Sequence, residues 1–280
     1  MKLQITLISI LAAIAACVGI FTNDGPGPSE YTTVRGETIE LYGQGVYKHM
    51  SSDVAIQGIA QDYVTLFIAI PLLIVSFAGF RKGSIRAKYI LTGTTGYLLV
   101  TYLFYTAMGM YNYLFLVWVA LLGLTFFTFL KLILSFNFAA TSGELSEKAP
   151  HKFAGGFLIF NSVIIALLWL SVVLPPLADG TIYPKELDHY TTLIVQGFDL
   201  GLLLPASFIT GLMLYRRKPA GLILGTVYLG FLSLLMTALC SKILAMALQR
   251  VNVIPAVFVI PAITVVTITA MVIMVRKVRS

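Results

Sequence analysis

Long apolar runs constrain this chain more than any other feature of its sequence. Segments such as Leu114–Leu134 and Val253–Val275 exceed the roughly 18 apolar residues that mark a membrane-spanning helix. Of the 280 residues, 58% are hydrophobic and only 11% are charged, whereas a soluble domain carries about 25% charged residues. We therefore expect a multi-pass integral membrane protein.

Eight such runs occur, and each is too long for a strand of a membrane barrel. Because lipid cannot hydrogen-bond an open strand edge, the runs should form helices. The expected fold class is thus an all-α bundle of eight transmembrane helices. The spans are Leu3–Phe21, Tyr63–Phe80, Tyr89–Met110, Leu114–Leu134, Phe153–Ala178, Thr192–Tyr215, Ala220–Leu248 and Val253–Val275.

Basic residues are distributed unevenly between the two sides of this bundle. With the N-terminus inside, 14 of the 19 lysines and arginines fall on the cytoplasmic side, among them Lys148 and Arg279, and 4 fall outside. This positive-inside pattern predicts that both termini are cytoplasmic. The net charge of +7 then reflects contact with anionic inner-leaflet lipids and not with nucleic acid.

The first span also has features of a targeting signal. The sequence IAAC at Ile14–Cys17 resembles the bacterial lipobox, in which cleavage precedes a cysteine that receives lipid. The apolar run continues to Phe21, which favours an uncleaved first helix. Lipid attached to Cys17 is the alternative.

One long extramembrane segment, residues 22–62, should form a small cap over the outer ends of the helices. Its first part, NDGPGPS, contains the glycines and prolines of a loop. The alternation of Thr38 and Glu40 with Ile39 and Leu41 favours a short hairpin. The stretch DVAIQGIAQD can continue as a short helix into the second span. About 40 residues are too few for an independent domain.

A faint repeat suggests two halves of four spans each, residues 1–150 and 151–280. The shared features, in order, are an aspartate, a proline, an aromatic–basic cluster and a tyrosine: Asp62, Pro71, Phe80–Lys82 and Tyr97, then Asp199, Pro205, Tyr215–Arg217 and Tyr228. Parallel repeats of this kind occur among transporters, with binding sites at the repeat interface. Alternatively, any two helix pairs joined by basic loops look alike.

Two charges lie inside the second half of the chain. Asp199 is about seven residues from the outer end of its span, and Lys242 is about six residues from the outer end of the next span. A short turn joins these spans, so they should be antiparallel neighbours with the two charges at matching depth. Embedded charges are costly and usually face a partner or water. We therefore expect Lys242 to be the counter-charge of Asp199.

Other polar residues belong to the same outer third and could line an outward-opening cavity. They are Gln196, Asp62, Tyr102, Tyr105, Thr106 and Asn112. For any single tyrosine, the aromatic belt at a membrane surface is the better explanation. The proline at 205 predicts an irregular backbone close to Asp199.

Most enzyme chemistry is missing from the sequence. No span contains a histidine, and HExxH, GxSxG and Walker A motifs do not occur. We expect no cofactor, and the sequence favours a protein without enzymatic activity. The weak candidates for a metal site are loop residues, namely His49, Asp53, Asp188 and His189.

Several phrases resemble a family of bacterial integral membrane proteins without an assigned activity. They are ELYGQGVY at Glu40–Tyr47, AQDYVTL at Ala60–Leu66, YNYLFLVWVALLGL at Tyr111–Leu124 and the stretch that begins DLGLLLPASF at Asp199. The resemblance implies a prokaryotic plasma membrane and no mechanism.

Two functions are consistent with these features. The first is a carrier or channel for a small solute or ion, with Asp199 and Lys242 as a coupling pair. The alternative is a sensor or assembly protein that binds a ligand or partner at its outer face. A lipid-modifying enzyme comes third, because the catalytic groups are missing.

Overall fold

The computed structural model describes residues 1–138 and 149–278, and it confirms a helical, multi-pass membrane protein. Among the described residues, seven helices are long and apolar enough to cross a membrane. They are α1 (Lys2–Phe21), the continuous helix α2–η2–α3 (Ser52–Arg81), α5 (Phe115–Leu134), α7 (His151–Asp179), the continuous helix α8–η4–α9 (Ile194–Tyr215), α10 (Pro219–Leu248) and α11 (Ala256–Arg276).

A further long helix, α4 (Ile85–Met108), lies where the third span is expected, but it is less apolar than these seven. Three of its buried threonines are satisfied within the helix itself. Thr92, Thr94 and Thr95 each donate to the carbonyl four residues earlier, at 2.7, 2.9 and 2.8 Å. These three threonines can therefore occupy the interior of the bundle with their hydroxyls paired.

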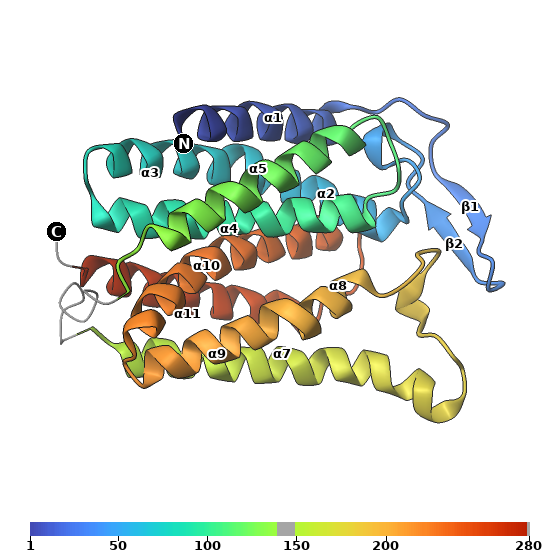
Figure 1. Cartoon of the computed structure of the whole chain (residues 1–280). Helices are drawn as coiled ribbons and strands as arrows, with labels where there is room; N and C mark the ends of the chain where they lie inside the picture. The colour runs from blue at the N-terminus through green and yellow to red at the C-terminus, as the bar shows by residue number, and fades with distance from the viewer. Residues whose placement is uncertain (139–148, 279–280) are drawn as a thin grey trace.

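The helices lie side by side, and the two ends of the bundle differ (Figure 1). One end holds both chain termini and the turns α3–α4 and α9–α10; we call it the termini end. The other holds the strands β1 (Ser29–Thr32) and β2 (Thr38–Leu41), and we call it the hairpin end. All the described segments expected to be cytoplasmic lie at the termini end. Lys148 and Arg279 lie outside the described residues.

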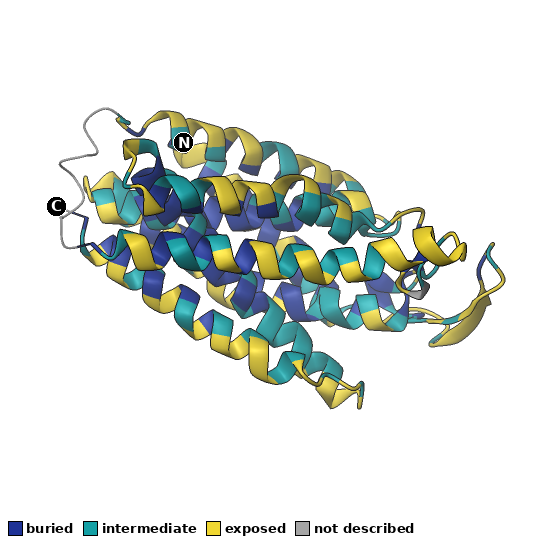
Figure 2. Ribbon diagram, turned by 90° about the horizontal axis from the view of Figure 1, so that it is seen from below, coloured by how far each residue is buried: buried dark blue, intermediate teal, exposed yellow. Residues whose placement is uncertain are grey.

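Helix α10 is the centre of the bundle. In its most apolar 18-residue window 72% of the residues are buried, whereas the corresponding fraction is 17–33% for the other six spans. It packs against α2, α4, α9 and α11, and buried residues concentrate along this interior (Figure 2). The contact between α9 and α10 confirms that these helices are neighbours.

The outer segment confirms the hairpin and corrects the position of the cap. The strands β1 and β2 pair in antiparallel register, with Glu30 opposite Glu40. A short turn of 3-10 helix, η1 (Gly45–Tyr47), follows. The cap then ends at residue 51, because the next helix already begins at Ser52.

Asp62 therefore does not start the second span at its rim, as the sequence suggested. It lies well inside a continuous helix, and its side chain is only 2% exposed. The reason is that DVAIQGIAQD and the following apolar run form one helix without a break. A residue that looked like an end is thus an interior one.

The second and sixth expected spans contain the same backbone irregularity. A π-helical turn occupies Thr65–Ala69 in one (η2) and Asp199–Leu203 in the other (η4). Each is followed by a 12-residue helix with proline near its start, α3 (Ile70–Arg81) and α9 (Leu204–Tyr215). Proline lacks the N–H that would continue the regular ladder, which explains the widened turn. The predicted irregularity near Asp199 is confirmed.

Candidate functional site

The site is built around Lys242, which the central helix carries near the hairpin end. Lys242 interacts electrostatically with two carboxylates, Asp199 and Asp62. Among the described residues it forms no ion pair within 4.0 Å with either of them. Lys242 thus interacts with Asp199 without direct contact, and Asp62 joins the group as a second acid; that Lys242 is the counter-charge of Asp199 stays a prediction.

Asp199 has a partner that the sequence analysis missed. The indole Nε1–H of Trp169 on α7 donates to Asp199 Oδ2 at 2.7 Å. Asp199 is the first residue of the π-helical turn η4, and its side chain is half-buried. A tryptophan in a span is usually assigned to packing or to the interfacial belt, so nothing in the sequence marked Trp169 as a donor.

Asp62 is sealed in a cluster of tyrosines. The Tyr47 hydroxyl donates to Asp62 Oδ2 at 2.5 Å, and the Tyr105 hydroxyl donates to Asp62 Oδ1 at 2.9 Å. Tyr102 is 1% exposed and packs edge-on against Tyr105, with ring centroids 5.9 Å apart. Burial raises the pKa of the Tyr47 phenol well above its usual value, and the neighbouring Asp62 raises it further. Tyr47 comes from the cap, so the cap closes this end of the site.

Two glycines make room for this cluster. A Cβ on Gly19 of α1 would lie 1.9 Å from Asp62 Oδ2, which no real contact allows. A Cβ on Gly58 would lie 3.2 Å from the Tyr47 ring. Helix α1 and the cap can therefore approach the Asp62 carboxylate only because these positions have no side chain.

A second polar group lies one residue away on α2. Gln61 is 5% exposed, and its Nε2 donates to the hydroxyls of Tyr97 at 2.7 Å and Thr101 at 3.0 Å. Gln61 Oε1 is buried and has no hydrogen-bond partner. An interchange of the amide O and N would leave the nitrogen unpaired instead. One amide atom of this side chain therefore lacks a partner in either assignment.

The remaining predicted cavity residues form no hydrogen bond with the charged side chains in the part of the chain that the structure describes. Asn112 stabilises the α4–α5 turn, since its Nδ2 donates to the Met110 carbonyl at 2.8 Å and its Oδ1 accepts from the Leu114 amide at 2.8 Å. The Thr106 hydroxyl is buried without a partner, and Gln196 is half-buried on α8 (Ile194–Phe198). The structure thus unites Asp62, Tyr102 and Tyr105, and it gives Asn112 a structural role.

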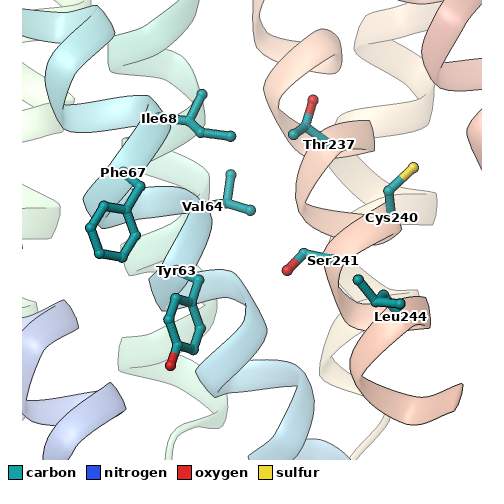
Figure 3. Close-up of a pocket in the computed structure, with 8 residues that line it drawn as sticks. All are labelled: Tyr63, Val64, Phe67, Ile68, Thr237, Cys240, Ser241 and Leu244. Atoms are coloured by element: carbon teal, nitrogen blue, oxygen red, sulfur yellow. The ribbon is translucent and has the colours of Figure 1, made fainter. Parts of the chain in front are cut away.

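Two hollows open at the seam between the α2–η2 helix and α10. One has a volume of about 370 Å³, and Figure 3 shows its walls, with Val64 and Ile68 on one side of the seam and Thr237 and Ser241 on the other. The second, of about 380 Å³, continues toward the hairpin end past Tyr42 and Gln249. Neither is lined by Asp199 or Lys242. Ser241 donates to the Ala60 carbonyl at 3.1 Å, which ties the two helices together beside the charges.

The weak metal candidates do not form a metal site in the described residues, where no group of three or more His, Cys, Asp or Glu side chains is placed to hold an ion. His189 instead contacts the backbone carbonyl of His49 at 2.9 Å. Asp188 offers its own carbonyl to the Arg35 guanidinium at 3.3 Å. Asp53 is exposed at the start of α2. His49, Asp188 and His189 thus take part in contacts between loops.

Comparison with known proteins does not place the chain in a family. No protein-family model, no curated protein and no solved structure matches this chain.

Proposed function

We propose that this protein is a carrier for a small solute or ion, with eight transmembrane helices and both termini in the cytoplasm of a prokaryotic cell. Seven of these helices are apolar enough on their own. The eighth is α4, which at 24 residues is long enough to cross and packs against α3, α5 and α10. With α4 counted as a span, all the described segments that the positive-inside pattern assigns to the cytoplasm lie at the termini end of the bundle.

Internal duplication supports the proposal. The π-helical turns, the prolines and the tight turns that follow are displaced by a constant 134 residues, as in Thr65 against Asp199 and Pro71 against Pro205. The helix contacts also correspond. In the first half α3, α4, α5 and α1 pack in a ring, and in the second half α9, α10, α11 and α7 do the same.

The constant displacement differs from the correspondence read from the sequence. It aligns Asp199 with Thr65 and not with Asp62, so each half contributes its acid at a different turn of an equivalent helix. Tyr97 and Tyr228 do serve similar places. The Tyr97 hydroxyl lies 3.4 Å from Thr65 Oγ1, and the Tyr228 hydroxyl donates to the Leu203 carbonyl at 2.8 Å, so each reaches the π-helical turn of its own half.

One observation carries the function. Lys242 on the central helix interacts with a carboxylate from each half, and both acids lie on helices that are interrupted by a π-helical turn and a proline. Embedded ionisable residues mark ion or substrate pathways, and carriers place their sites on interrupted helices at the interface of repeats. A shared lysine can favour one acid or the other as the halves move, which is what coupling requires.

A sensor without transport is the second candidate, and the outer surface favours it. Arg35, which follows β1, donates to the carbonyls of Asp188 at 3.3 Å and Tyr190 at 3.0 Å in the α7–α8 loop. Its guanidinium also lies 5.4 Å from the Tyr183 ring centroid. The cap and the α7–α8 loop are thus joined by hydrogen bonds. A ligand bound there would contact both halves of the chain.

Reconstitution into sealed vesicles distinguishes the two. We expect one or more solutes in a broad panel of small ions, sugars and amino acids to cross with the parent protein, and Lys242→Met to abolish that flux. Lys131→Met is the matched control, because Lys131 is exposed and only donates to Gln4 Oε1 at 3.3 Å. If no solute crosses while one of them raises the unfolding temperature, the sensor replaces the carrier.

A further inference from the structure

The charges around Lys242 do not balance. Asp62 and Asp199 contribute two negative charges when ionised and Lys242 contributes one positive charge, and both acids interact with this one lysine. Asp62 is almost completely buried, at 2% exposure. An uncompensated charge in such surroundings is strongly destabilising. One additional monovalent cation would bring the group to neutrality.

The hydrogen bonds at Asp62 show which cation fits. In the ionised state Tyr47 donates to Oδ2 and Tyr105 donates to Oδ1. The Tyr105 hydroxyl also lies 3.1 Å from the Gly58 carbonyl, a second acceptor for its single hydrogen. If Oδ1 carries a proton, that O–H can donate to the Tyr105 oxygen while Tyr105 turns to donate to Gly58. Every group is then paired in both states.

A metal ion fits this place poorly. Hard cations need several oxygen ligands at once, and both oxygens of Asp62 already accept hydroxyl hydrogens. The glycine at position 19 leaves no free space, because even a methyl group there would overlap Oδ2. A proton needs no coordination shell and no added volume.

The groups that face Asp62 from each neighbouring element are few. Tyr47 comes from the cap, Tyr102 and Tyr105 come from α4, and Lys242 comes from α10. Helix α1 presents only Gly19 at the carboxylate. None of these described neighbours is a carboxylate. The phenols of Tyr47 and Tyr105 donate hydrogen bonds to Asp62, and Tyr97 and Tyr102 of α4 interact with it electrostatically.

We propose that Asp62 takes up and releases a proton, with Tyr105 as the positioning residue whose hydroxyl turns between Asp62 Oδ1 and the Gly58 carbonyl. The proton comes from water at the hairpin end and returns to water, and no electrons move. Only one part of this inference rests on the proposed function: if the protein is a carrier, the proton is its coupling ion. The proton site itself exists with or without transport.

Infrared spectroscopy of the purified protein in detergent tests it without any solute or gradient. We expect the C=O stretching band of a protonated carboxylic acid at about pH 7, well above the range in which exposed aspartates are protonated. The band should disappear in Asp62→Asn and persist in Asp53→Asn, a control with an exposed aspartate on the same helix. Tyr105→Phe should shift the band, because the acid then loses its acceptor.

Labelling the aspartate carboxyl carbons of the parent protein with 13C, combined with Asp199→Asn, assigns the band if Asp62→Asn fails to fold. The proposal is overturned if no such band belongs to Asp62 at any pH at which the protein stays folded, or if the band responds to sodium and not to pH. Vesicle flux is measured separately, so the carrier can fail while the proton site stands, and the reverse.

Discussion

The two carboxylates that interact with Lys242 belong to helices with the same π-helical turn and proline, but their surroundings differ. Asp62 lies one turn before its π-helical turn and is enclosed by two phenol donors, whereas Asp199 begins its π-helical turn, is half-buried and has one indole donor. Two helices with a π-helical turn thus present one enclosed acid and one more accessible acid to the same lysine. The difference shows that two helices with the same irregularity can present their acids unequally when the acid is moved along the helix by about one turn.

Removing the shared lysine should have the largest effect. Lys242→Met removes the counter-charge of the carboxylates in the interior of the bundle, and we expect the free energy of unfolding to fall by about 3 kcal/mol. Thermal unfolding in detergent measures the change. The double variant Lys242→Met with Asp199→Asn should recover part of the loss, and equal stability of Lys242→Met and the parent would end the idea of a shared lysine.

Gly19→Ala tests how tightly the first acid is sealed. The new methyl group would overlap Asp62 Oδ2, so α1 must move away, and we expect a loss of about 2 kcal/mol. Gly123→Ala in α5 is the matched control, because nothing lies within 4 Å of its added carbon. The control should be neutral or slightly stabilising. A stable Gly19→Ala protein would mean that the Asp62 site is looser than described.

Removing one donor from each acid compares the two sites directly. Tyr47→Phe takes a hydroxyl from a buried carboxylate and should cost about 2 kcal/mol, whereas Trp169→Phe takes the indole from a half-buried one and should cost about 1 kcal/mol. Water can replace the donor at Asp199 more easily than at Asp62. The order of the two losses in chemical denaturation is the test, and the reverse order would contradict it.

The smallest effect is expected at the outer surface. Arg35→Met removes the hydrogen bonds from the cap to the α7–α8 loop and should cost about 1 kcal/mol or less. Its consequence is local: amide hydrogen exchange should rise in residues 181–193 and stay unchanged around Asp62. Burial, which raises the pKa of Tyr190 to about 12, keeps that phenol neutral throughout such a measurement.

Much of the fold could be predicted from the sequence, because membrane helices leave an unmistakable apolar signal. The hairpin, the neighbouring helices α9 and α10 and the irregular backbone near Asp199 all followed from local patterns. The site was only partly accessible. Tyr47 lies in a loop and Trp169 in an apolar run, and neither position carries a signal of its partner.

Asp62 was misplaced for a specific physical reason. Asp62 and its neighbour Gln61 are both polar, so the apolar run appears to begin after them. The structure buries both side chains because tyrosines from η1 and α4 satisfy them. Hydropathy describes one residue at a time and cannot anticipate partners that arrive from 15 to 43 positions away along the chain.

The crossing of α4 and α10 has a mechanical consequence. A Cβ on Gly93 would lie 3.0 Å from the Gly230 backbone, so the two main chains touch with no side chain between them. If α10 tilts about this contact, its atoms move little at the crossing and most at the two ends of the helix. Lys242 lies 12 residues beyond Gly230, which is a lever of about 18 Å, so a tilt of about 10° displaces it by about 3 Å.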